Sequence, residues 1–201
     1  MALVGSGPGS LDNEPGFIDS HDLVVRVNNY KLFPQTGNRT DVFYSFFGTS
    51  IRKSADELKK DGVTLCLCKC PNAWPIHSDW HNRNGKIAGV DYRYIYKNRE
   101  PWWFCDTYIP TVDEFMEKFN LLGRHQPTTG FSAILDMIEF KPEKLYLTGF
   151  DFFRSGIHNV TDKWREKNTQ DPIGHMPELE LDWLKDNLGR IEVDKRLSEA
   201  L

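Results

Sequence analysis

Three short polar segments of the sequence carry residues that could bind a phosphate group. The first is a glycine-rich turn, Val4–Ser10 (VGSGPGS), whose glycines let backbone N–H groups approach an anion while its serines add hydroxyl donors. The second is Asn28 with Asn29, and the third is the segment 126–130 (QPTTG). A tight exposed turn and helix capping by threonine are the simpler explanations. Three such segments at one sheet edge would favour a nucleotide or sugar-phosphate site.

Several other anion-binding proteins are disfavoured by the same residues. The turn lacks the third glycine of the dinucleotide fingerprint and the Lys-Ser/Thr pair of a Walker loop. No acidic residue follows it in a proper dinucleotide unit, which disfavours an NAD-dependent dehydrogenase. The net charge of −4 gives no general electrostatic footprint for nucleic acid. Any bound anion must therefore be met by local groups.

The histidines are the candidate proton-transfer groups. His175 lies just before a helix that we expect to begin at Pro177, and a helix N-terminus disfavours the imidazolium form. A neutral imidazole can accept a proton, so His175 is a candidate general base. His158 lies in the same polar segment, after the predicted strand 144–150. The simpler interpretation of both residues is a solvated loop histidine.

A metal site is a weaker alternative. His77 and His81 have a spacing that could bind zinc on a helix, together with Cys70 or Asp79. Aromatic neighbours in that segment instead favour a loop that covers something. The sequence also contains no Asp-x-Asp pair of the kind that holds Mg²⁺ against a sugar diphosphate. We therefore expect chemistry without a metal or other cofactor.

The elements that must position these residues follow an α/β pattern. Apolar runs alternate with segments of helical period, which predicts one Rossmann-like domain over residues 1–201, with a largely parallel sheet and helices on both faces. Six strands are expected at 2–5, 23–28, 41–46, 63–70, 144–150 and 190–193, with a weaker seventh at 92–96. Four helices are expected: two after the capping boxes at 54–57 and 111–114, one over 131–140, and one from Pro177 to a C-cap at Gly189.

Compartment and chain class are read from the cysteines and the apolar runs. No run reaches the roughly 18 apolar residues that span a bilayer, and the first residues form no signal peptide, so we expect a cytoplasmic protein. Cys66, Cys68 and Cys70 alternate along one predicted strand. Alternation places them on one buried face, where reduced thiols are expected rather than disulfides.

Taken in order, these segments resemble the sialyltransferases. Leu3–Pro8 (LVGSGP) followed by Ile18–Asn28 (IDSHDLVVRVN) is similar to the large sialylmotif of that family, and the second of these runs is highly specific. Pro127–Gly130 (PTTG) with Leu145–Phe150 (LYLTGF) downstream is similar to the small sialylmotif. His175-x4-Glu180 has the spacing of the very small motif, and His158 stands where the third motif places a histidine. The segment Thr148–Phe153 (TGFDFF) is also similar to bacterial CMP-sialic-acid transferases.

The resemblance implies a GT-A-like variant of the Rossmann fold and an activity. It implies a metal-independent, inverting glycosyltransferase that moves a keto sugar acid, sialic acid or Kdo-like, from a CMP-sugar donor to a glycan hydroxyl. His175 would be the base, His158 would stabilise the departing phosphate, and Glu180 and Asp151 would support them. The residues implied to bind the CMP group are Gly5, Ser6, Gly7, Asn28, Thr128, Thr129 and Gly130.

The sequence also departs from the family's pattern. Ser6 stands where the family generally has Asn, and the residues directly after His158 lack the aromatic side chains of the third motif. The cysteines that link the two large motifs in Golgi enzymes are missing at those positions. These departures favour a viral or bacterial enzyme of the cytoplasm, or a donor such as CMP-Kdo. The alternative function is a CMP-binding module that has lost transfer.

Overall fold

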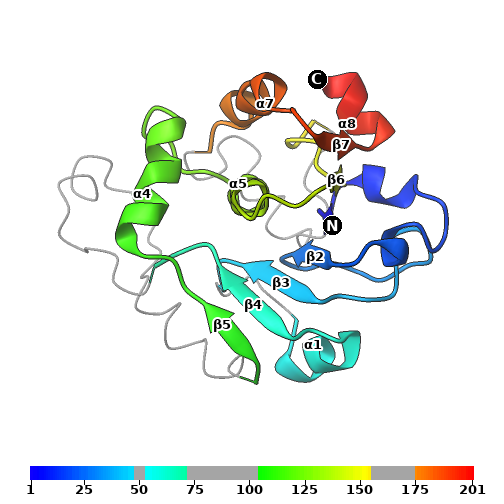
Figure 1. The fold of residues 1–201 in the computed structure, drawn as a ribbon. Helices are drawn as coiled ribbons and strands as arrows, with labels where there is room; N and C mark the ends of the chain where they lie inside the picture. The colour runs from blue at the N-terminus through cyan, green and yellow to red at the C-terminus, as the bar shows by residue number, and fades with distance from the viewer. Residues whose placement is uncertain (48–52, 72–103, 155–174) are drawn as a thin grey trace, which may run out of the picture.

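The structure is a computed structural model that describes residues 1–47, 53–71, 104–154 and 175–201 (Figure 1). Its strands form one sheet in the order β5-β4-β3-β2-β1-β6-β7, and all six pairings between neighbours are parallel. The strands are β1 Ala2–Val4, β2 Val24–Val27, β3 Val42–Ser45, β4 Leu65–Cys68, β5 Asp106–Tyr108, β6 Leu145–Thr148 and β7 Ile191–Val193. The predicted parallel α/β fold is confirmed.

The described residues also form five α-helices and two 3₁₀ turns, and the last helix follows the last strand. The helices are α1 Ala55–Asp61, α4 Val112–Leu121, α5 Thr129–Glu139, α7 Pro177–Asp186 and α8 Lys195–Ala200, and the turns are η1 Pro8–Leu11 and η2 Ile18–Ser20. Both expected capping boxes are present, since Ser54 and Thr111 exchange hydrogen bonds with Glu57 and Glu114. Each box satisfies two N–H groups that a helix start leaves unpaired.

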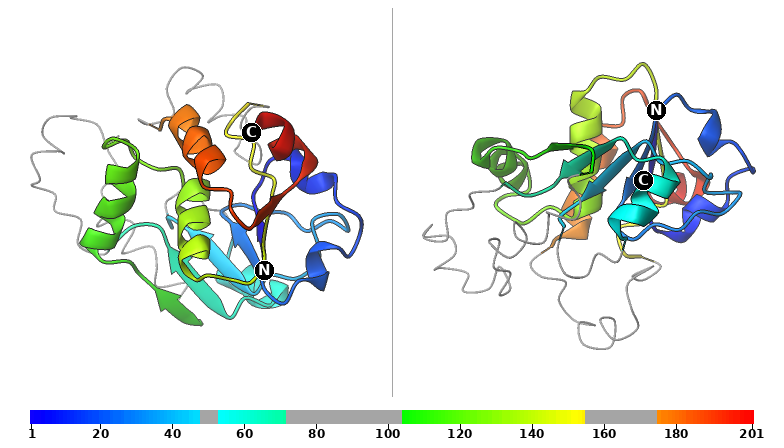
Figure 2. Two further views of the ribbon diagram at one scale, coloured as in Figure 1. Left: turned by 45° about the horizontal axis from the view of Figure 1, so that its top comes forward. Right: turned by 90° about the horizontal axis from the view of Figure 1, so that it is seen from below.

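Helices cover both faces of the sheet. The helix α5 crosses β1, β2 and β3 and joins α7 in a cluster that includes Leu3, Val25 and Leu147 (Figures 1 and 2). Leu58 of α1 packs in a second cluster with Phe43 and the cysteines of β4.

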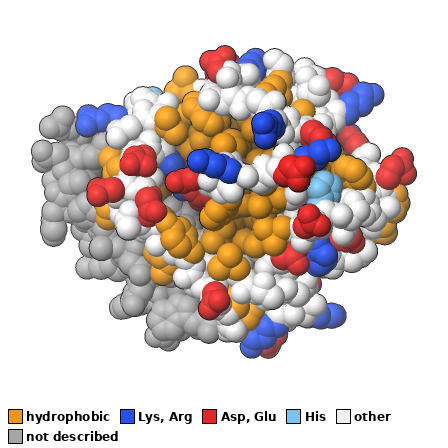
Figure 3. Space-filling model, in the orientation of Figure 1, with side chains coloured by type: hydrophobic (Ala, Val, Ile, Leu, Met, Phe, Trp, Pro, Cys, Tyr) orange, Lys and Arg blue, Asp and Glu red, His pale blue; other side chains and the backbone are white. Residues whose placement is uncertain are grey.

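The face of the molecule seen in Figure 1 also carries hydrophobic side chains at its centre, with charged side chains around them (Figure 3).

The order of the strands fixes where a ligand is expected. The chain runs from β1 outward through β2 to β5 on one side, and then adds β6 and β7 on the other side of β1. The two halves therefore diverge between β1 and β6. In open parallel sheets, ligands bind outside the carboxyl ends of the strands at such a point.

Some expected elements differ from those observed. The helix α7 ends at Asp186 with Asn187 as its C-cap, so the C-cap predicted at Gly189 is wrong; Gly189 has φ +48° in the turn before β7. The third helix starts at Thr129, two residues earlier than predicted, because Thr128 caps it. Neither β5 nor α8 was predicted, and the expected strand at 92–96 lies outside the described residues.

The prediction that three cysteines are buried free thiols is confirmed, but β4 ends at Cys68 and not at residue 70 as expected, so Cys70 lies just beyond the strand. Cys66, Cys68 and Cys70 are buried free thiols in one apolar cluster. Burial raises the pKa of the Cys66 thiol, which favours its neutral form. The Sγ atom of Cys105 lies 3.6 Å from the Sγ atom of Cys66, a contact between two thiols.

Candidate active site

The glycine turn after β1 is locked onto the turn after β6. The N–H of Gly5 donates to the carbonyl of Thr148 and the N–H of Gly7 donates to the carbonyl of Gly149, both at 2.8 Å. A Cβ atom on Gly5 would lie 2.4 Å from the Gly149 oxygen, and one on Gly7 would lie 2.7 Å from it. Close backbone packing therefore explains both glycines, and their N–H groups are used inside the fold.

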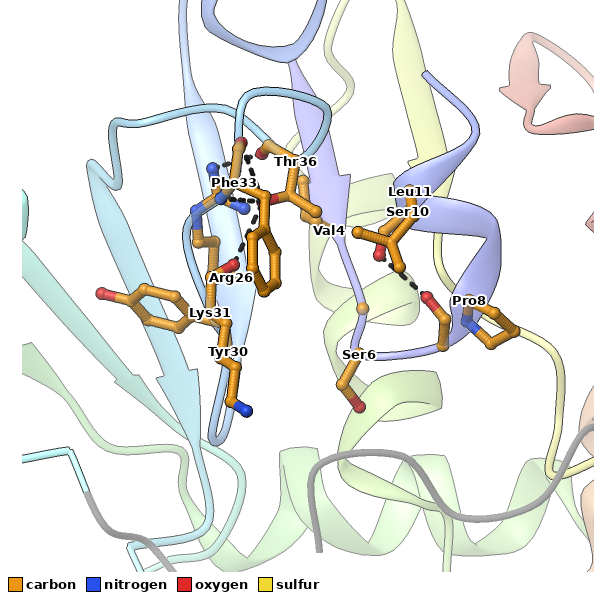
Figure 4. Close-up of a pocket in the computed structure, with 12 residues that line it drawn as sticks. Val4, Ser6, Pro8, Ser10, Leu11, Arg26, Tyr30, Lys31, Phe33 and Thr36 are labelled. Carbon is orange, nitrogen blue, oxygen red and sulfur yellow. Dashed lines mark hydrogen bonds between the residues drawn. The ribbon is translucent and has the colours of Figure 1, made fainter. Parts of the chain in front are cut away.

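A cavity of about 140 Å³ opens beside this turn. It lies between residues 4–11 and the segment after β2, with Ser6 and Lys31 facing one another across it and the Phe33 ring along one side (Figure 4). The buried Arg26 side chain also lines it and donates to the carbonyls of Thr36 and Arg39. Ligand pockets usually measure about 300–1,000 Å³, so this cavity has room for only part of a nucleotide.

Asn28 extends the same sheet edge to β2 and β3. Its N–H donates to the carbonyl of Tyr44, and its side-chain oxygen accepts from the Ser45 hydroxyl at 3.2 Å. Its φ of +53° is uncommon for a residue other than glycine. The residue is thus held at the position where the sequence predicts a CMP contact.

The start of α5 is held by a carboxylate from another helix. Thr128 is the N-cap, and its hydroxyl accepts from the N–H of Phe131 at 3.0 Å. The same hydroxyl and the N–H of Thr128 donate to the two oxygens of Glu180 in α7, at 2.8 and 2.5 Å. Thr128 therefore has the capping role, and Glu180 fixes the entry into α5.

The next two residues leave donors at the helix start. Thr129 and Gly130 begin α5, and their N–H groups form no hydrogen bond within the described part of the chain. The Phe150 ring lies 3.2 Å from an ideal Cβ on Gly5 and 3.1 Å from one on Gly130. It therefore brings the glycine turn next to these free donors, as the sequence predicts for one common edge.

His175 is fixed against the same segment. Its Nδ1 lies 2.7 Å from the carbonyl oxygen of Gln126. A carbonyl only accepts, so Nδ1 carries the proton and Nε2 has the free lone pair. Burial, together with the Lys69 ammonium, lowers the pKa of His175 to about 3. The ring is neutral at pH 7, as expected, although burial rather than the helix N-terminus is the main cause.

Two charged side chains lie buried near the start of α5, Glu180 against Thr128 and Lys69 close enough to act on His175. Glu180 is 0% exposed, and burial raises its pKa to about 7 against the effect of its Thr128 hydrogen bonds. Lys69 follows β4 and is 3% exposed, and burial lowers its pKa. Sequence reasoning missed Lys69. The only signal was a lysine between Cys68 and Cys70 in an otherwise apolar run.

A buried polar network holds Asp136 of α5 against β3 and α4. The hydroxyl of Tyr44 donates to Asp136 at 2.5 Å, and Lys118 forms an ion pair with the other oxygen of the same carboxylate. Burial and this carboxylate raise the pKa of Tyr44 well above its usual value. The network joins β3, α4 and α5, and it was not anticipated from sequence.

The remaining candidate residues lie partly outside this description. Asp151 follows the β6 turn, where its carboxylate accepts from the N–H of Phe153 and lies next to the Gly7 position. His158 lies outside the described residues, and so do His77, His81 and Asp79 of the zinc alternative. Their roles stay predictions. None of the helices in the described ranges is long and apolar enough to cross a membrane.

The fold is shared with solved structures of sialyltransferases. A mammalian sialyltransferase has a TM-score of 0.56 at 17% identity, over 96% of this chain and 68% of its own. The α-2,3-sialyltransferase Cst-I from Campylobacter jejuni has a TM-score of 0.62 at 13% identity, over 96% and 74%. This chain has the sialyltransferase fold.

A third structure with this fold holds a substrate analogue. It is the sialyltransferase CstII from Campylobacter jejuni in complex with CMP-3FNeuAc, with a TM-score of 0.54 at 13% identity, over 98% of this chain and 86% of its own. No protein-family model matches the sequence, and no curated protein matches it. The sialyltransferase fold is thus evident from structure, and the predicted GT-A-like architecture is confirmed.

Proposed function

We propose that this protein is a glycosyltransferase that transfers a keto sugar acid from a CMP-sugar to a glycan hydroxyl. The observation that carries the proposal is the fixed His175 ring, whose Nδ1 is held by Gln126, three residues before the start of α5, and whose Nε2 is unprotonated. The sialyltransferase fold and the CMP-3FNeuAc bound to CstII support the choice of donor. A base and an anion-binding helix start at one sheet edge are the two parts that such a transfer needs.

The reaction would proceed by one displacement. Nε2 of His175 takes the proton of the acceptor hydroxyl while its oxygen attacks the anomeric carbon of the sugar. The bond from that carbon to the phosphate oxygen breaks, and CMP leaves with the bonding electron pair. Attack opposite the leaving group inverts the anomeric configuration. Because its pKa lies well below 7, His175 is unprotonated and its Nε2 lone pair is available, and a donor anion bound nearby would raise that pKa toward the operating pH, where a general base is most effective.

The leaving phosphate would be stabilised by the start of α5. The N–H groups of Thr129 and Gly130 point out of an 11-residue helix, where the helix dipole favours negative charge. Ser6 and Asn28 would complete the nucleotide site from the neighbouring strands. A nucleoside monophosphate carries less charge than a diphosphate, so we propose that neither a metal nor another cofactor takes part.

Calorimetry and a transfer assay test this function. We expect CMP to bind with equal affinity in EDTA and in Mg²⁺, and more tightly than UDP or NAD. Incubation with CMP-sialic acid or CMP-Kdo and glycan acceptors should release CMP and form a glycoside. A strict metal requirement would contradict the metal-free mechanism. Binding of CMP without transfer to any acceptor would favour the CMP-binding module, and the cytoplasmic location stays a prediction.

A further inference from the structure

Lys69 is a buried cation at the carboxyl edge of the sheet. It directly follows β4 and is 3% exposed, and its backbone N–H donates to the carbonyl of Ser45 at 2.9 Å. The Ser45 hydroxyl in turn donates to Asn28. Lys69 therefore belongs to the row of edge residues in which the proposed donor site lies.

In the described part of the chain, the positive charge of the Lys69 ammonium has no carboxylate in contact with it. Among residues that the structure describes, no carboxylate lies within 4.0 Å of the Lys69 ammonium, whereas the nearby Lys118 is paired with Asp136. Glu180 is the acidic side chain whose charge acts on the Lys69 ammonium. Both Glu180 oxygens, however, accept hydrogen bonds from Thr128. Its other charged or titratable neighbours are His175, Cys68 and Cys70.

A buried ammonium without a contacting carboxylate is costly, because burial removes its hydration. A bound anion would remove most of that cost. A CMP-sugar acid carries two anionic groups, the phosphate and the sugar carboxylate. The proposed site needs positive charge, and the donors of the α5 start supply only partial charges.

We propose that Lys69 is a donor-binding residue whose ammonium pairs with an oxyanion of the CMP-sugar, either the phosphate or the sugar carboxylate. The inference rests on the proposed function and adds a residue that no sequence motif indicated. The ion pair forms only with donor bound, so Lys69 contributes to affinity for the charged part of the donor and not for the nucleoside.

Three ligands tested against the wild type, one variant and one control variant separate the possibilities. Dissociation constants of cytidine, CMP and CMP-3FNeuAc are measured by calorimetry for the wild type and for Lys69→Met, with thermal melting to check the fold. Lys59→Met is the matched control, because Lys59 is an exposed lysine of α1. If Lys69→Met fails to fold, Lys69→Gln replaces it, since its side-chain amide keeps a hydrogen-bond donor for the polar neighbours.

We expect cytidine affinity to stay unchanged while the charged donor loses roughly 10- to 100-fold, the usual effect of losing a hydrogen bond to a charged group. A loss for both CMP and CMP-3FNeuAc assigns the phosphate, and a loss for CMP-3FNeuAc alone assigns the carboxylate. Equal affinities of wild type and variant for all three ligands would overturn the role of Lys69 alone. A wild type that binds none of them would overturn the proposed function as well.

Discussion

The glycine turn after β1 and the start of α5 lie at one edge of the sheet but are built in different ways. The turn is held by backbone hydrogen bonds from Gly5 and Gly7 to the β6 turn, with no room for a side chain at either glycine. The start of α5 is held by side chains from elsewhere in the chain, His175 and Glu180, both with shifted pKa values.

This difference separates two tasks at one edge of the sheet: backbone contacts fix the shape of the turn, and buried side chains place titratable groups at the start of α5. A backbone contact has no titratable group, so a change in the turn acts on stability. Buried side chains at the α5 start carry charge and protons, so we expect a change there to act on the proposed catalysis and on pH dependence. Substitutions in the two regions should therefore have separable effects.

The largest expected effect is that of His175→Ala on turnover. Loss of the general base should lower kcat roughly 10²–10⁴-fold, while CMP affinity stays nearly unchanged because other residues bind the nucleotide. Steady-state kinetics and CMP calorimetry on the same protein check this. Near-normal transfer, or abolished CMP binding, would show that His175 is not the base and would make His158 the leading candidate.

A substitution in the turn should instead affect folding. Gly5→Ala places a Cβ against the Gly149 carbonyl and should lower the free energy of unfolding by about 1–3 kcal/mol, as overpacking does. Urea denaturation measures the loss. Gly16→Ala is the control, since its Cβ would meet nothing within 4 Å and only its φ of +84° opposes the change. Equal losses in the two variants would contradict the close-packing explanation.

The pH dependence of the free energy of unfolding distinguishes the buried acid Glu180 from the buried base His175 at the α5 start. The pKa of Glu180 is raised to about 7, so the folded state binds more protons than the unfolded state, and Glu180 should cost stability as pH rises from 4.5 to 7. The pKa of His175 is lowered to about 3, so stability should fall as pH falls from 6.5 to 3.

Two glutamine variants expose these opposite slopes. Relative to wild type, Glu180→Gln should gain stability as pH rises through its window, and His175→Gln should gain it as pH falls. Each slope is at most about 1.4 kcal/mol per pH unit, the value for one proton. Urea denaturation between pH 4 and pH 8 measures both, and parallel curves for wild type and variants would refute the assigned protonation states.

The smallest effects should come from two adjacent threonines. Thr129→Val should weaken CMP binding about 2- to 10-fold through a lost hydroxyl donor, with little change in stability. Thr128→Val should lower the free energy of unfolding by about 1–2 kcal/mol, since it removes both the N-cap and the hydroxyl that donates to the buried Glu180. Calorimetry and denaturation on both variants test the division, which fails if Thr129→Val is the less stable of the two.

Local signals predicted much of this architecture. The capping boxes at Ser54 and Thr111 and the apolar runs of the central strands depend on neighbours in sequence, so the sequence analysis located them. The edge strand β5 has only three residues, two of them exposed, and therefore no hydrophobic pattern to detect. The short helix α8 has only a weak local signal, the N-cap Asp194 three residues before the buried Leu197.

The candidate site was predictable only in part, because its decisive contacts join distant residues. The motif residues could be named, yet nothing local says that Glu180 holds Thr128 or that Gln126 fixes the His175 tautomer. The glycines of the first turn predict backbone N–H groups that bind an anion, whereas the N–H groups of Gly5 and Gly7 donate to the β6 turn. The burial of Lys69 depends on tertiary packing as well.

The position of β1 has a consequence for how this protein folds. Leu3 pairs with Val25 on one side, close in sequence, and with Leu147 on the other, far along the chain. This interior strand therefore gains its second partner only after most of the chain has been synthesised. Such high contact order slows folding, because loop closure must precede the contacts that stabilise it. Until β6 arrives, one side of β1 presents an unpaired strand edge that can aggregate with other chains.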